Sequence, residues 1–120
     1  MTASPDPIEA LRREFHADDG FLVELRCFAR WDKAAFARLI AVMQRYLESA
    51  DHGDRLERWM AEGFWLHDDM VKVLSSSPGF RNQLGQAYLD AAYQRLSELA
   101  HWFFIGESAY QDNTMPPFDA

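Results

Sequence analysis

The chain has 120 residues, 48% of them hydrophobic and 14% aromatic, and its 12 Lys and Arg against 19 Asp and Glu give a formal net charge of −7. That much hydrophobicity excludes an intrinsically disordered chain, and the acid excess argues against DNA or RNA as a partner, because phosphate binding requires clustered cations. At this length we expect one domain, spanning residues 1–120.

The first two predicted helices are short. Residues 4–7 contain helix-starting side chains, and apolar residues then follow at helical spacing. Residues 21–31 are ambiguous, because their alternating apolar pattern fits a strand while Phe21, Leu25 and Phe28 also fit a helix. We favour a helix, since a lone strand would leave its backbone hydrogen-bonding groups without partners and the sequence offers no second convincing strand.

Two longer helices follow, each marked by apolar residues that recur every three or four positions. Asp32 has the acceptor side chain of a helix N-cap, and the stripe after it predicts a helix that reaches about Ser49. The next stripe predicts a helix over 56–74. Within that helix, Gly63 predicts the close approach of a neighbouring segment, at a helix-propensity cost of about 1 kcal/mol.

The last predicted helix is long, and the linker-like run 75–79 leads into it through residues 80–82. Gly106 stands where a left-handed C-cap is expected to end it. The tail 107–120 contains Pro116 and Pro117, so we expect it to be non-helical. Together these elements predict an all-α fold, a small antiparallel bundle of about four to five helices.

Candidate catalytic and metal-binding residues are few. His67 lies on an apolar stripe, where a hydrogen-bonded core histidine is a better interpretation than a metal ligand or general base, because further ligands do not stand out. Glu98 and His101 have the Glu-x-x-His spacing of di-iron bundles, but such sites require a second pair that the sequence lacks. Cys27 lies in an apolar run, where a thiol is usually inert. We therefore expect no enzyme activity, metal or cofactor.

A partner-binding surface is predicted on the outward faces of the last two long helices. Trp65 interrupts a charged stripe that contains Glu62 and Asp69, with Asp68 beside it, and Phe104 ends the polar face of the final helix. Aromatic side chains among polar ones are typical anchors of protein interfaces. The alternative is that the short N-terminal helices cover these aromatic side chains.

The acid excess is concentrated in the second half of the chain. Residues 61–120 hold 8 acidic and 3 basic side chains, whereas residues 1–60 hold 11 and 9. An acidic surface suits a basic protein partner, and the electrostatic attraction between the two surfaces raises the rate of association. Solubility alone is an equally good explanation of the excess.

The expected compartment is the cytoplasm. Cys27 is the only cysteine, so an internal disulfide is impossible, and the N-terminus lacks the basic start and apolar run of a signal peptide. No stretch approaches the roughly 20 apolar residues that span a bilayer, so we expect no membrane partner. A monomer and a homodimer are both compatible with the sequence.

Two segments, 56–65 and 91–108, resemble small helical immunity proteins of interbacterial toxin systems. The similarity covers the middle and C-terminal two thirds of the chain and consists of aromatic packing patterns. It implies a cytoplasmic protein that binds one cognate toxin domain and blocks its activity. No binding residue is transferred position by position, because such families diverge fastest where they touch the toxin.

We therefore expect a toxin-neutralising protein without catalysis of its own, with a basic toxin favoured as its partner. Two rival hypotheses remain open at this level. One is a ligand-binding or enzymatic bundle with a cavity of at least ~300 Å³ around His67, lined by Trp59, Tyr88 or Trp102. The other is a dimeric effector chaperone with a self-complementary apolar patch.

Overall fold

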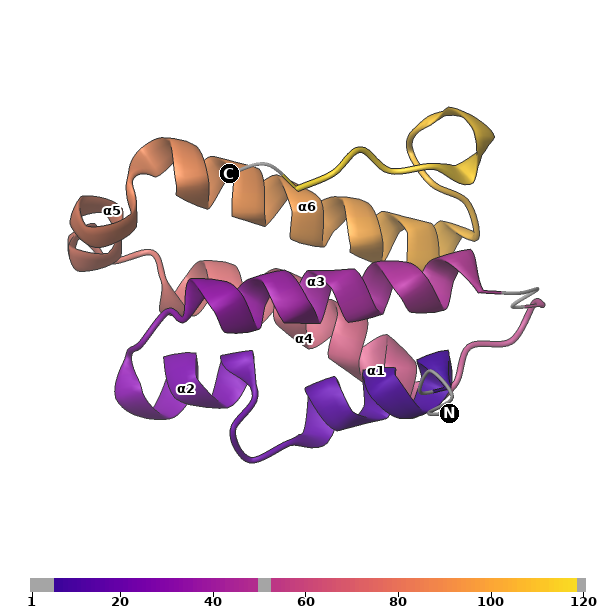
Figure 1. Cartoon of the computed structure of the whole chain (residues 1–120), viewed down its shortest axis with the longest axis horizontal. Coiled ribbons are helices and arrows are strands. Elements are labelled where there is room, and N and C mark those ends of the chain that lie inside the picture. Colours follow the sequence, from indigo (N-terminus) through magenta and orange to yellow (C-terminus); the bar gives the residue numbers. More distant parts are fainter. Residues whose placement is uncertain (1–5, 50–52, 119–120) are drawn as a thin grey trace, which may run out of the picture.

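A computed structural model describes residues 6–49 and 53–118, and it confirms the all-α prediction (Figure 1). The described part of the chain forms six α-helices and no strand: α1 (Pro7–His16), α2 (Phe21–Phe28), α3 (Lys33–Glu48), α4 (Arg58–Leu74), α5 (Pro78–Leu84) and α6 (Gln86–Ile105). A 3₁₀ turn, η1 (Gln111–Asn113), follows α6.

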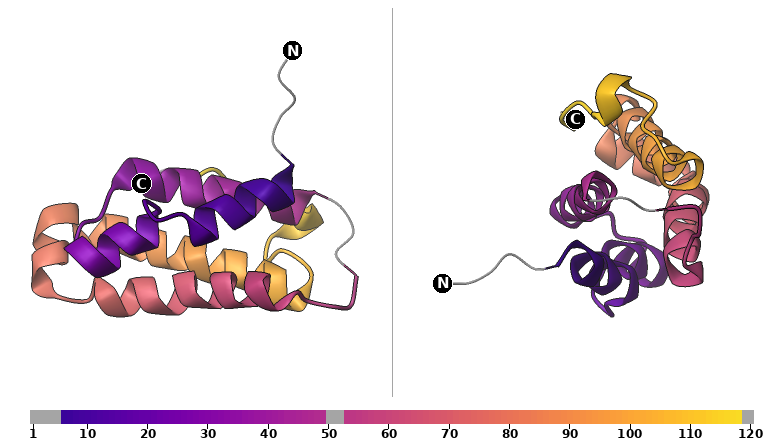
Figure 2. Two further views of the ribbon diagram at one scale, coloured as in Figure 1. Left: turned by 90° about the horizontal axis from the view of Figure 1, so that it is seen from below. Right: turned by 90° about the vertical axis from the view of Figure 1, so that its right-hand side faces the viewer.

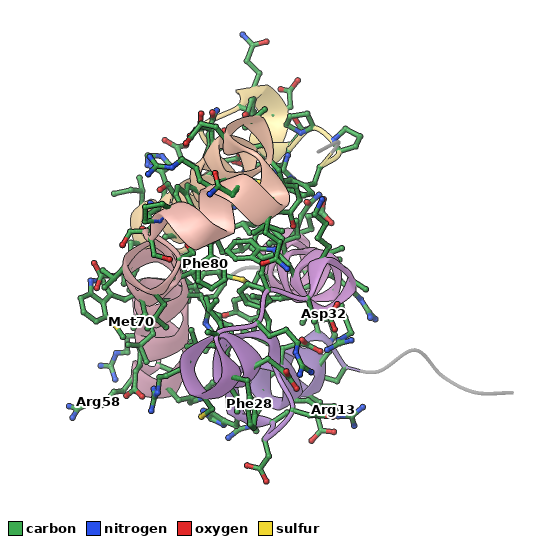
Figure 3. All side chains as sticks on the ribbon, turned by 90° about the vertical axis from the view of Figure 1, so that its left-hand side faces the viewer. Arg13, Phe28, Asp32, Arg58, Met70 and Phe80 are labelled. Atoms are coloured by element: carbon green, nitrogen blue, oxygen red, sulfur yellow. The ribbon has the colours of Figure 1, made fainter. Side chains whose placement is uncertain are left out.

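The helices form a bundle of four antiparallel arms. The helices α1 and α2 follow one another in the first arm, and α3, α4 and α6 make the other three, each running opposite to the arm before it (Figures 1 and 2). Helix α4 packs against α6 and α2, whereas α3 packs against α1 and α6. Figure 3 shows the side chains that fill the space between the arms, with Phe80 pointing inward and Phe28 outward.

Local signals in the sequence account for where these helices begin and end. The Asp32 carboxylate accepts hydrogen bonds from the backbone N–H groups of Ala34 and Ala35 at 3.0 and 3.2 Å, which confirms the predicted N-cap of α3. Gly106 ends α6 with φ of 97°, the predicted left-handed C-cap. The ambiguous run 21–31 is helical as far as Phe28.

Two features of the C-terminal half differ from the sequence prediction. A short helix, α5, occupies 78–84, where a linker and the approach to the final helix were expected, and Gly85 with φ of 88° separates it from α6. The tail after α6 contains η1 and is held against α6, because Arg95 Nη2 donates a hydrogen bond to the Pro116 carbonyl at 2.5 Å and Met115 is buried.

Gly63 marks a close contact between α4 and α1, as its position in the sequence predicts. A Cβ built on Gly63 would lie 2.1 Å from Cδ2 of Phe15. The Phe15 ring cannot easily move aside, because it stacks on His67 and meets Phe64 edge to face. Only glycine at position 63 therefore lets the two helices approach this closely.

The substitution Gly63→Ala is expected to lower the free energy of unfolding by about 1–3 kcal/mol, because the displaced Phe15 ring outweighs the gain in helix propensity. Urea unfolding followed by circular dichroism measures this loss. In the control Gly79→Ala, the nearest atom to the new Cβ is Ser77 Oγ at 4.0 Å, so no clash opposes the helix propensity of alanine, and the free energy of unfolding is expected to stay the same or rise by up to about 1 kcal/mol. Equal losses in the two variants would contradict the close contact at Gly63.

Candidate functional site

The outward face of α4 carries the clearest candidate interface. Trp65 is 55% exposed, and Glu62 and Asp69, about one helical turn to either side, are exposed as well. In the end-on view of Figure 2, α4 lies at the edge of the bundle with no described helix on its outer side. The structure thus decides against the alternative that the N-terminal helices cover Trp65.

The two carboxylates beside Trp65 are available to a partner. Within residues 6–49 and 53–118, the carboxylates of Glu62 and Asp69 have no hydrogen-bond or ion-pair partner. Val73, one turn beyond Asp69, is exposed as well and extends the apolar part of this face. We call Glu62, Trp65, Asp69 and Val73 the α4 face.

Asp68 differs from its neighbours because its charge is already paired. Its carboxylate accepts hydrogen bonds from Lys72 Nζ at 2.7 Å and from Ser97 Oγ at 3.0 Å. Lys72 Nζ also contacts Ser97 Oγ at 2.5 Å. This network joins α4 to α6, so Asp68 has a packing role that the predicted interface role did not include.

Phe104 lies at another place in the molecule. It is in the last turn of α6, packs edge-on against Phe103 with ring centroids 5.0 Å apart, and lines a pocket of about 420 Å³ at one end of the bundle. Trp65, Glu62 and Asp69 do not line this pocket. The predicted site residues therefore fall into two surfaces.

This pocket brings together residues that sequence reasoning did not single out. Ile8, Leu56 and Ile105 are exposed and line it together with Phe104. Leu56 was expected inside a helix, but α4 begins only at Arg58. The signal available in the sequence was weak, because these residues lie at the ends of elements, where apolar periodicity does not show burial.

His67 is a hydrogen-bonded core histidine, as the favoured interpretation predicted. The side chain is 3% exposed, Nδ1 lies 2.7 Å from the Gly63 carbonyl oxygen, and the ring stacks on Phe15 with centroids 4.9 Å apart. Burial lowers the pKa of His67 to about 4, against a smaller opposing effect of the Gly63 hydrogen bond. The ring is therefore neutral at pH 7, with the proton on Nδ1 donated to Gly63.

The three side chains proposed to line a cavity around His67 lie in different parts of the molecule. Trp59 packs against Phe15 and His16, whereas Trp102 lines the 420 Å³ pocket. The Tyr88 hydroxyl accepts a hydrogen bond from Trp31 Nε1 at 2.9 Å in another part of the core. These positions do not favour a ligand site centred on His67.

The remaining candidate residues take part in packing or face solvent. Glu98 accepts a hydrogen bond from the Tyr110 hydroxyl and lies 3.4 Å from Arg95 Nε, while His101 and Cys27 are exposed. The hydrogen bond from Tyr110 to Glu98 raises the pKa of the phenol. In the part of the chain that the structure describes, no group of three or more His, Cys, Asp or Glu is placed to hold a metal ion.

Comparisons of the chain with protein-family models, curated proteins and solved structures give no match. Within the described residues, no helix has both the length and the apolar character needed to span a membrane. The functional argument therefore depends on the residues and their geometry.

Proposed function

We propose that this chain is a toxin-neutralising immunity protein that binds a cognate bacterial toxin or effector domain through the α4 face. The observation that carries the proposal is the exposed indole of Trp65 between the carboxylates of Glu62 and Asp69, which have no partner among the residues that the structure describes. Trp is one of the residue types most enriched among the anchors of protein interfaces, and the exposed indole and Val73 together give this face an apolar centre beside charged groups. The resemblance of 56–65 to helical immunity proteins includes this segment.

The chemistry of the α4 face favours a basic partner. An Arg or Lys of the partner can lie over the indole of Trp65 and pair with Glu62 or Asp69 at the same time. The net charge of −7 adds a long-range attraction that speeds encounter with a basic surface.

Co-expression tests the class of function. The toxic domain is sought in the reading frame next to this gene, where it would form the end of a larger protein. Its expression alone is expected to stop bacterial growth, and growth is expected to recover when this chain is produced with it. A toxic domain that remains fully toxic in the presence of this chain would contradict the proposal for that pair.

The substitution Trp65→Ala is expected to weaken the complex by about 2 kcal/mol, or roughly 30-fold in Kd, because it removes a central anchor. Since the indole is exposed, the melting temperature of the free protein should stay nearly unchanged. Isothermal titration calorimetry against the toxin domain measures the loss.

Phe28→Ala is the matched control for Trp65→Ala, because Phe28 is 66% exposed but lies on α2, away from the α4 face. Its affinity for the toxin is expected to equal that of the natural protein. If Trp65→Ala binds as tightly as the control, Trp65 is not the anchor. The double variant Glu62→Gln, Asp69→Asn should mainly slow association at low salt.

A further inference from the structure

A groove at one end of the bundle, lined by both apolar and polar groups, forms a second candidate surface. The C-terminal ends of α3 and α6 lie there beside the start of α4, at the right-hand end in Figure 1. The pocket of about 420 Å³ between them has buried Met60 and Phe103 among its lining residues. We call it the end groove.

Exposed apolar side chains are concentrated around the end groove. The described chain has seven exposed large hydrophobic residues, and four of them line this one pocket: Ile8, Leu56, Phe104 and Ile105. Single exposed apolar residues are common on protein surfaces, but a cluster around a cavity marks a binding site. The volume also lies within the range of about 300–1,000 Å³ that is usual for ligand pockets.

The charges of the lining indicate what the end groove can bind. Asp54 and Glu57 contribute two carboxylates, and Arg55 contributes one guanidinium. The Glu57 carboxylate also accepts a hydrogen bond from Trp59 Nε1 at 2.6 Å, which holds it in place. A groove that combines exposed apolar side chains with one more carboxylate than cations favours an apolar group that has a cation next to it.

We infer that the end groove is a docking point for a basic protein segment, which inserts an aromatic or long aliphatic side chain next to a Lys or Arg. That this segment belongs to the toxin rests on the proposed function, whereas the chemistry of the groove does not. The end groove and the α4 face share no residue. The changes in binding free energy caused by substitutions in the two surfaces are therefore expected to add.

Two capped dipeptides test the chemistry without the toxin: acetyl-Phe-Lys-amide and acetyl-Phe-Glu-amide. With the lysine peptide, backbone amide signals of Leu56, Phe104 and Ile105 are expected to shift saturably, with a Kd on the order of 1 mM, as suits a small flexible ligand. The glutamate peptide should bind at least about fivefold more weakly. Absence of saturable shifts at these residues, or equal affinity for the two peptides, would overturn the inference.

Variants locate the binding within the end groove. Ile105→Ser is expected to abolish the peptide-induced shifts while the protein stays folded, because Ile105 is 63% exposed in the last turn of α6. Phe104→Ala should have the same effect, and Phe28→Ala, at an exposed position outside the groove, should have none. Peptide binding that survives Ile105→Ser and Phe104→Ala would place the site elsewhere and overturn the inference.

The toxin and the oligomeric state provide two further readouts. Ile105→Ser should weaken toxin binding at least about tenfold, and by the same factor in the Trp65→Ala background.

If growth rescue fails but the lysine peptide binds, the proposed function fails and the end groove stands. If rescue succeeds and the peptide does not bind, the inference fails alone. Light scattering that shows a dimer dispersed by Ile105→Ser would assign the groove to a second copy and overturn the inference.

Discussion

The substitution Phe64→Ala is expected to lower the free energy of unfolding by about 3–5 kcal/mol. Phe64 is fully buried, and its ring stacks on Phe103 of α6 with centroids 4.3 Å apart and planes inclined by 7°. The same ring meets Phe15 of α1 edge to face at 5.6 Å. One side chain of α4 therefore joins three arms of the bundle, and its removal leaves a cavity that backbone relaxation cannot readily fill.

Urea unfolding at pH 7 measures this loss, and Phe28→Ala supplies the matched control. Phe28 is an exposed phenylalanine, so its replacement should change the free energy of unfolding by less than about 0.5 kcal/mol. The loss expected at Phe64 is large beside the roughly 5–15 kcal/mol that stabilises a typical domain. Similar effects of the two substitutions would contradict the packing of Phe64 between α1 and α6.

The helices were predictable because their signals are local. Asp32 supplies both an N-cap side chain and the start of an apolar stripe, and Gly63 occurs on a stripe where any side chain would be expected to be apolar. The break at Gly85 was not predictable in the same way. A glycine within a helical pattern is often tolerated, and nothing in the sequence indicates that Gly85 takes a positive φ between two helices.

The candidate site was predictable only in part. Trp65 lies opposite the apolar stripe of its own helix, so periodicity alone placed it on the outward face. Asp68 lies near that face, but its partner Ser97 belongs to α6, and a helical pattern does not show what a neighbouring helix presents. The end groove combines the ends of four elements far apart in sequence, including Ile8 and Ile105. Its assembly depends on tertiary packing.

His67 is expected to make the stability of the protein depend on pH. Its pKa is about 4 in the folded protein and close to the ordinary value of 6.5 in the unfolded chain. Between these values the unfolded chain binds a proton that the folded protein does not. The stabilisation is therefore complete above pH 6.5 and is lost as the pH falls toward 4, by about 3 kcal/mol.

Urea unfolding between pH 7.5 and pH 4 measures this dependence, and two variants isolate the part that belongs to His67. Carboxylates also titrate in the lower part of this range, but their contribution is common to all the proteins compared. His67→Gln should be less stable at pH 7.5 and lose much less stability on acidification. His101→Gln, which removes an exposed imidazole, is the matched control for the loss of a histidine.

An NMR titration of the His67 imidazole measures the pKa of this one side chain directly. The signals of His67 are expected to stay those of the neutral Nδ1–H form down to about pH 5, because the ring is enclosed by Phe15 and bonded to Gly63. A midpoint near 6.5 would mean that water reaches the ring. In that case the rival hypothesis of a ligand site around His67 would regain its physical basis, because a general base or metal ligand near neutral pH requires such an accessible imidazole.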